Sequence, residues 1–237
     1  GKMPDMKMPR WKIWLSYLME LHVESAASEH NPHLYVSLRQ GRYQLSTANA
    51  VYSYGDLYGN FARAFELVDL DRLPGREVLL LGFGLGSIPY MLEKTFHRTY
   101  HYTAVELDEA VLYLAARYTL PQLDAGIELV QADAHAYVKQ CRTAYDLICM
   151  DVFLDDYIPH EFETQAFLQH LGDLLNSGGL LLYNRLAATT KDQRRSRRFY
   201  EQHFRAVFPE GALVDVGGNY MLVNRKGFLK GGHRGAG

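Results

Sequence analysis

Apolar segments alternate regularly with amphipathic ones between residues 77 and 185, and this alternation constrains the fold more than any other feature of the chain. A strand that is apolar at every position must be buried on both faces, as in a parallel sheet covered by helices. The pattern predicts a Rossmann-like, doubly wound α/β fold with a mostly parallel sheet. Strands are expected at 77–82, 101–107, 127–133, 145–151 and 179–185, and helices at 87–96, 109–118, 134–141 and 161–175.

The segments before this region have a different character. Short β-like runs at 11–23, 33–40 and 42–54 are punctuated by turn residues, which is typical of antiparallel strands. A helical pattern follows at 61–73. We therefore expect a small N-terminal antiparallel β region over residues 1–60.

The segments after it predict how the sheet ends. A charged helical segment at 191–208 precedes two apolar runs that flank Gly217, Gly218 and Asn219. These turn residues suit a tight hairpin. The second unit, residues 61–237, is thus expected to be a mostly parallel sheet that closes with an antiparallel hairpin.

Composition narrows the class of partner and the compartment. With 237 residues, 48% hydrophobic residues and a formal charge of −2, the chain can bury a core and has no global attraction for nucleic acid. Cys141 and Cys149 fall in a helix end and a buried strand, as reduced thiols do, which favours the cytoplasm. No apolar run approaches the ~20 residues that span a bilayer. We expect a small-molecule partner, no nucleic acid and no membrane. A homodimer is compatible with the sequence, which leaves the oligomeric state open.

Two further patterns have plain interpretations. RNA contact is one interpretation of the arginines at 194–198, but a solvated helix face is favoured because they spread around the helix while Phe199, Phe204 and Val207 supply its buried side. Two histidines, His30 and His33, lack companion ligands at metal spacing, so no metal site is predicted.

Three glycines, Gly82, Gly84 and Gly86, directly follow the first apolar strand. In a strand–turn–helix unit such a turn lies at the carboxyl edge of the sheet, where its amides can meet a ligand. A tight turn without a ligand is the alternative. Glu106 ends the next strand, about twenty residues on, where a carboxylate can accept from ribose hydroxyls. Asp133 ends the third strand. Together the three features predict a nucleoside site.

Each of these acids also has a structural interpretation. A strand-end carboxylate can be merely solvated, and Asp133 can cap the helix that follows it. A dinucleotide-binding dehydrogenase is a rival function. Its glycine fingerprint favours Gly or Ala at the position of Ser87, however, and the terminal hairpin also fits such an enzyme poorly.

Four segments carry a resemblance to a known family: "VLLLGFGLG", "YTAVELDEAV", "VQADAHAYV" and "YDLICMDVFLDD". They resemble the motifs of class I AdoMet-dependent methyltransferases, and more narrowly the spermidine synthase-like branch, over most of the chain. The resemblance implies S-adenosyl-L-methionine, or its decarboxylated form, as cofactor. It also implies that Glu106 binds ribose, that Asp133 and Ala134 border adenine, that Asp151 is the catalytic base, and that Asp155 is the second, polyamine-holding aspartate.

Two departures from that family shape the predicted activity. Leu85 stands where an aspartate of the family holds the amine of decarboxylated AdoMet, and an ammonium beside a leucine would lose water without gaining a partner. The segment "LSTANAVYSYGDLYGN" replaces the usual signatures, and its Tyr52, Tyr54 and Asp56 are candidates to line the substrate mouth. Methyl transfer is therefore favoured. Aminopropyl transfer and nucleoside binding without turnover are the alternatives.

An acidic cluster follows the fourth strand. Asp151, Asp155 and Asp156 lie where an acceptor would bind, and Asn184 ends the fifth strand on the same edge. A carboxylate there can position an amine or hydroxyl and take its proton. Asp155 or Asp156 capping the next helix in a solvated loop is the alternative. The prediction is a transferase acting on a small amine or hydroxyl acceptor.

Overall fold

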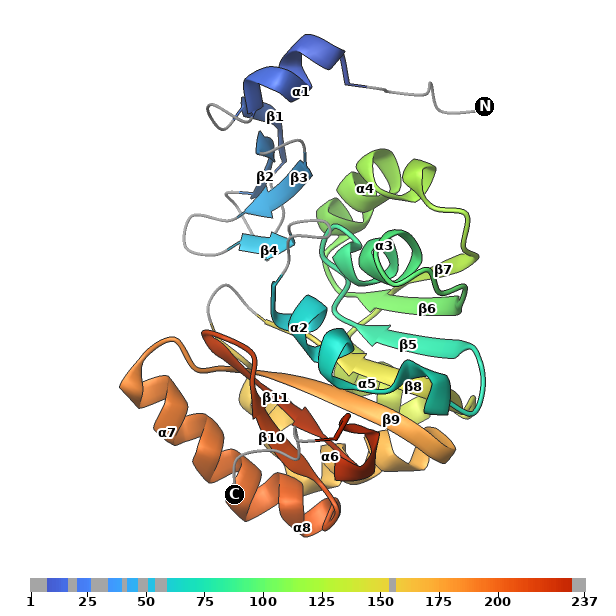
Figure 1. Cartoon of the computed structure of the whole chain (residues 1–237), viewed down its shortest axis with the longest axis vertical. Coiled ribbons are helices and arrows are strands. Elements are labelled where there is room, and N and C mark those ends of the chain that lie inside the picture. The colour runs from blue at the N-terminus through green and yellow to red at the C-terminus, as the bar shows by residue number, and fades with distance from the viewer. Residues whose placement is uncertain are drawn as a thin grey trace.

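A seven-stranded sheet forms the centre of the part of the chain that the computed structural model describes, residues 8–16, 21–26, 34–39, 42–46, 51–53, 59–153 and 157–231 (Figure 1). The strand order is β10-β11-β9-β8-β5-β6-β7. The strands are β5 (Glu77–Leu81), β6 (His101–Glu106), β7 (Ile127–Gln131), β8 (Tyr145–Met150), β9 (Leu175–Leu186), β10 (Ala212–Asp215) and β11 (Asn219–Val223).

The pairing of these strands confirms the predicted fold class. Strands β7, β6, β5, β8 and β9 pair in parallel, whereas β11 is antiparallel to β9 and β10 is antiparallel to β11. The chain runs outward from β5 to β7 and then restarts at β8 on the other side of β5. Ligands of open α/β sheets bind at such a switch point, outside the carboxyl ends of the strands. A ligand is therefore expected outside the carboxyl ends of β5 and β8.

Alternate residues of β5 enter two different cores. Val78 and Leu80 pack with α3 (Ser87–Lys94) and α4 (Glu109–Tyr118), whereas Leu79 and Leu81 pack with α5 (Ala134–Gln140) and α6 (Gln165–Asp173). This two-sided burial explains why the strand is apolar at every position after its first residue.

The N-terminal region differs from the prediction at its start. The run 11–23 was expected to be β-like, but Arg10–Ser16 forms helix α1 and only the end of that run lies in β1 (Leu21–Ala26). The carbonyl of Pro9 accepts from the amides of Lys12 and Ile13 and so begins a helical turn. Proline suits this place because its φ is already helical.

The remaining N-terminal strands are β2 (Leu34–Arg39), β3 (Arg42–Ser46) and β4 (Val51–Ser53), which form an antiparallel sheet in the order β1-β2-β3-β4. Figure 1 shows this sheet on the same side of the molecule as α4. Glu24 of β1 connects the two through Arg117 and Tyr118 of that helix. Its carboxylate lies 3.3 Å from Nε of Arg117 and accepts a hydrogen bond from the Tyr118 hydroxyl.

Three predicted helices have different limits in the structure. Helix α2 (Gly59–Leu67) ends before 73 because Val68 forms a β-bridge with Leu229 and Asp69 caps the 3₁₀ turn Leu70–Arg72. The segment predicted at 161–175 is the 3₁₀ turn His160–Glu163 followed by α6. The charged segment is α7 (Thr190–Phe199), a π turn at Tyr200–Phe204 and α8 (Arg205–Val207).

The two helices beside the glycine turn differ in what they expose. Met91 of α3 is fully buried, whereas Tyr113 of α4 is 44% exposed. The Tyr113 hydroxyl accepts from Arg117 one turn later, on the outer face of α4. Across the described residues, helices are too short or too polar to cross a bilayer.

Candidate active site

The glycine turn joins β5 to α3 at the switch point. Gly82, Gly84 and Gly86 have φ values of 83°, 55° and 79°, which lie in the left-handed region that favours glycine. A Cβ on Gly82 would lie 2.3 Å from the carbonyl oxygen of Asp151, and one on Gly86 would lie 2.9 Å from the Phe83 ring. The residue after β8 and the Phe83 ring thus lie so close to Gly82 and Gly86 that these two positions cannot carry a side chain. Contact with a nucleoside remains a prediction for these glycines.

Glu106 turns its carboxylate back onto this turn. Oε1 accepts from the amides of Phe83 and Gly84, at 3.2 and 3.3 Å, and Oε2 accepts from the amide of Asp108 at 3.2 Å. Burial raises the pKa of Glu106, and these backbone donors oppose that rise. A carboxylate has about four acceptor positions, so room remains on Oε2 for a hydroxyl group. The predicted ribose acid therefore lies directly at the glycine turn.

Asp133 takes the helix-capping role that the sequence left open. It precedes α5, and its carboxylate accepts from the amides of His135 and Ala136 at 3.2 and 3.4 Å. Ala134, the first residue of that helix, is buried. Capping does not use the whole carboxylate, so a contact of Asp133 or Ala134 with adenine stays a prediction.

Asp151 emerges at the carboxyl end of β8, opposite Gly82. Its amide donates to the carbonyl of Leu81 at 2.8 Å, and its Oδ1 accepts from Nδ2 of Asn184 at 3.0 Å. Asn184 was predicted to contact the acceptor substrate, but this amide, only 1% exposed, is directed at the aspartate. Burial and the charge of Asp151 raise the pKa of Cys149, which lies two residues earlier in β8.

Four of the other predicted site residues lie outside the described residues: Tyr54, Asp56, Asp155 and Asp156. Tyr52 lies in β4, but its side chain is also outside the description. Their proposed roles at the substrate mouth therefore stay predictions. Clusters of three or more metal-ligating side chains do not occur among the residues that are described.

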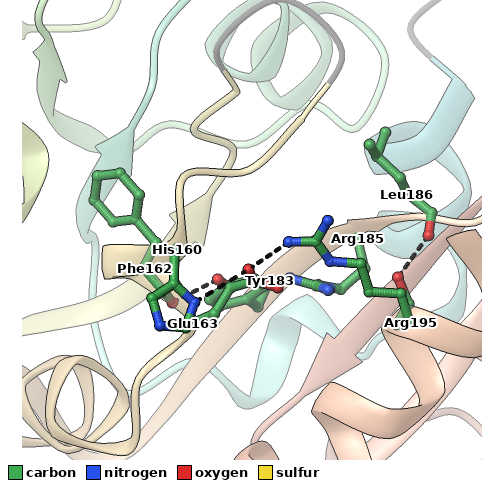
Figure 2. A network of polar contacts seen from close by, with 8 residues as sticks. His160, Phe162, Glu163, Tyr183, Arg185, Leu186 and Arg195 are labelled. Carbon is green, nitrogen blue, oxygen red and sulfur yellow. Dashed lines mark hydrogen bonds and ion pairs between the residues drawn. The ribbon is translucent and has the colours of Figure 1, made fainter.

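An ion-pair network centred on the buried pair Glu163 and Arg185 lies where β9 ends and the segment after β8 returns to the sheet (Figure 2). Glu163 accepts from Arg185 at 2.8 Å and from Arg195 at 2.9 Å, and His160 lies 4.0 Å away. The guanidinium of Arg185 also stacks over the Phe199 ring, 4.3 Å from its centroid. Glu163 and Phe199 thus hold the guanidinium of Arg185 in place.

Sequence reasoning missed the roles of Glu163 and Asn219. Asn219 donates from Nδ2 to Oδ1 of Asn184 at 2.9 Å, whereas its position after two glycines indicated only a turn residue. Glu163 stands between Phe162 and the helix cap Thr164, which resembles an ordinary acidic first turn. The sequence signal for Glu163 would have been Arg185 in an otherwise apolar strand, because a buried cation needs an acidic partner.

Comparison with known proteins identifies the family. The model of the spermine/spermidine synthase domain matches residues 66–216, which include the glycine turn, Glu106, Asp133, Asp151 and Asn184. This chain belongs to the spermine/spermidine synthase domain family. The resemblance read from the motifs is thereby confirmed.

Individual relatives carry two kinds of name. A polyamine aminopropyltransferase of Vibrio vulnificus (strain CMCP6) is 34% identical over 110 residues, which are 45% of this chain and 36% of the relative. An eEF1A lysine and N-terminal methyltransferase homolog of Drosophila melanogaster is 27% identical over 118 residues, 46% of this chain and 17% of the relative. The chain thus spans little more than a third of the first relative and less of the second.

Solved structures of the same two kinds share the fold. A spermidine synthase in complex with the transition-state analogue AdoDATO has a TM-score of 0.64 and 17% identity, covering 86% of this chain and 71% of its own. Human methyltransferase-like protein 13 in complex with SAH has a TM-score of 0.56 and 23% identity, covering 75% and 83%.

Proposed function

We propose that this chain is a transferase that moves an alkyl group from an AdoMet-type sulfonium nucleoside to a small amine. The observation that carries the proposal is the convergence of Glu106 and Asp151 on one glycine turn. Glu106 accepts from the amides of that turn, and Gly82 packs against the backbone of Asp151. A donor whose ribose bound Glu106 would extend its sulfonium along the turn toward Asp151.

The chemistry asks little more of the protein than position and a proton acceptor. The amine nitrogen attacks the carbon next to the sulfonium, the carbon–sulfur bond breaks, and the sulfur leaves with its electron pair. The attacking nitrogen must be neutral, because an ammonium has no lone pair to form the new bond. Asp151 can orient the incoming ammonium and take its proton before the attack, and the charge of this carboxylate suits a site that faces a sulfonium.

Aminopropyl transfer is the first candidate for the group that moves. The matching family model and the relative from Vibrio vulnificus both support it. Decarboxylated AdoMet would be the donor, and a diamine such as putrescine the acceptor. This ranking differs from the one predicted from the sequence, because the relatives favour aminopropyl over methyl transfer.

Methyl transfer is the second candidate, and Leu85 favours it. This side chain lies in the glycine turn, is 2% exposed and packs in the apolar core that contains α3 and α4. The family resemblance places the aspartate that holds the donor amine at this position. The ammonium of decarboxylated AdoMet would lose hydration there without a partner, and this one observation supports full-length AdoMet, and with it methyl transfer, as the second candidate.

Calorimetric titration with AdoMet and with decarboxylated AdoMet, followed by product analysis with putrescine, tests the proposal. Spermidine formed from the decarboxylated donor supports the first candidate. Methylated product from AdoMet supports the second. Leu85→Asp should shift donor preference toward the decarboxylated form, with Leu85→Asn as the uncharged control. If neither nucleoside binds, the proposal fails. If both bind and no acceptor reacts, the protein is a nucleoside-binding protein.

A further inference from the structure

We propose that Asn219 is a positioning residue that orients the amide of Asn184, so that Asn184 donates to Asp151 and holds its carboxylate for the acceptor. This inference rests on the proposed function, in which Asp151 takes the proton. The sequence indicated Asn219 only as a turn residue of the terminal hairpin, and in the structure it is the first residue of β11.

The three side chains come from three neighbouring strands and share one face of the sheet. In the antiparallel pair, Asn219 is opposite Leu186 and Asn184 is opposite Met221. The two asparagines are therefore diagonal neighbours, close enough for side chains to meet. The residues two positions farther into the sheet on this face are Cys149 before Asp151, Leu182 before Asn184 and Met221 after Asn219. All three belong to one core cluster. The polar row thus continues a buried layer out to the carboxyl edge.

The three polar side chains, Asn219, Asn184 and Asp151, form hydrogen bonds that all run in one direction, from donor to acceptor. An ionised carboxylate only accepts, so Asn184 must present its NH₂ group to Asp151. The distance is 3.0 Å, and Asn184 is too buried for water to take over either end of its amide. Its oxygen must then face Asn219, whose Nδ2 donates to it at 2.9 Å. The donor group on Asn219 consequently selects the orientation of Asn184 that supports a charged Asp151.

This arrangement orients the carboxylate of Asp151. The bond from Asn184 to Oδ1 stabilises the ionised form and fixes the direction in which the carboxylate faces. Two other titratable groups belong to this part of the site: Cys149, two residues earlier, and Glu106, which accepts from the glycine turn that Asp151 contacts through Gly82. A thiol is only a weak donor and a carboxylate is an acceptor, so the amide of Asn184 is the strongest of these partners for an ionised Asp151.

Asn219→Asp is the decisive variant because it keeps the shape and replaces the donor with an acceptor. The new carboxylate competes for the NH₂ group of Asn184 and tends to turn the amide oxygen toward Asp151. Asn219→Gln keeps the donor, and the half-exposed position leaves room for the longer side chain. Asn224→Asp is the matched control. Asn224 lies just past β11, and its amide bonds to Leu181 and Gly179 at the opposite edge of the sheet.

Two measurements on these variants test the inference. With saturating donor, Asn219→Asp should lower kcat by about 10- to 100-fold, a part of what a positioned base contributes, with donor Kd within about twofold of the parent. Asn219→Gln should restore kcat. Without any substrate, ¹³C NMR of the Asp151 carboxyl should show its titration midpoint at higher pH in Asn219→Asp than in the parent.

The outcomes separate this inference from the proposed function. An unmoved Asp151 midpoint in Asn219→Asp overturns the inference, whatever the activity. So does an equal fall in kcat in Asn224→Asp, because that would reflect general loss of stability. If the midpoint moves but the parent transfers no group to any acceptor, the positioning role stands and the proposed function fails.

Discussion

Glu163 compensates the charge of Arg185, and replacing it with Gln tests how much stability depends on that pair. The two side chains are 9% and 3% exposed, and their atoms lie 2.8 Å apart. Nε of Arg185 has no hydrogen-bond partner among the described residues. The guanidinium therefore depends on Glu163, on the Tyr183 hydroxyl and on its stacking over Phe199. The substitution Glu163→Gln removes the opposite charge without changing the shape.

The expected cost follows from the burial of the pair. Breaking a buried ion pair by removing one partner costs about 3–5 kcal/mol. The Gln oxygen can still accept one hydrogen bond, which recovers about 1 kcal/mol. The second pair adds little, because the Arg195 side chain is 58% exposed and such pairs contribute about 0–1 kcal/mol. The free energy of unfolding should thus fall by about 2–4 kcal/mol. For a chain of this size that lowers Tm by roughly 4–16 °C.

Urea unfolding followed by circular dichroism measures this loss. Arg195→Met is the control for the exposed ion pair between Arg195 and Glu163, and it should lower the free energy of unfolding by no more than about 1 kcal/mol. Glu163→Leu combined with Arg185→Met should recover most of the loss, because apolar residues often replace a buried pair without cost. A loss below about 1 kcal/mol in Glu163→Gln would refute the reasoning, since Arg185 would then be hydrated in solution.

Three further predictions concern the site. Glu106→Gln should weaken donor binding about tenfold in calorimetry. The pKa of Glu106 is raised in the folded state, so the contribution of its titration to stability is lost as pH rises. In urea unfolding, the variant should therefore become more stable relative to the parent above about pH 4.3. Gly82→Ala should destabilise more than Gly217→Ala, because both have φ near 85° but Gly217 has no atom within 4 Å of an added Cβ; equal losses in thermal melts would remove Asp151 as the cause. Asp151→Asn should cut turnover by about 10²–10⁴ with donor binding kept, and a sharp fall in Tm with no separate loss of activity would make the residue structural.

Periodicity identified the elements whose burial is decided by their own residues. Strand β8 is buried along its whole length and was recognisable because it is apolar apart from Asp146. Helix α4 has the predicted limits, with Asp108 as its cap. Periodicity failed where a segment is short or half-exposed. Trp11 and Trp14 of α1 are 62% and 67% exposed, so in that helix apolar residues do not mark the buried side.

The sequence by itself determined which residues reach the candidate site. Parallel strands bring all their carboxyl ends to one edge, so Glu106, Asp133 and Asp151 could be assigned to that edge from strand order alone. Only the tertiary structure decided what each of them touches. Asp151 meets Asn184 through the register of β8 and β9, and Asn184 meets Asn219 through the register of β9 and β11. Such contacts join residues that are distant along the chain, and the local pattern of apolar and polar residues carries no information about register between strands.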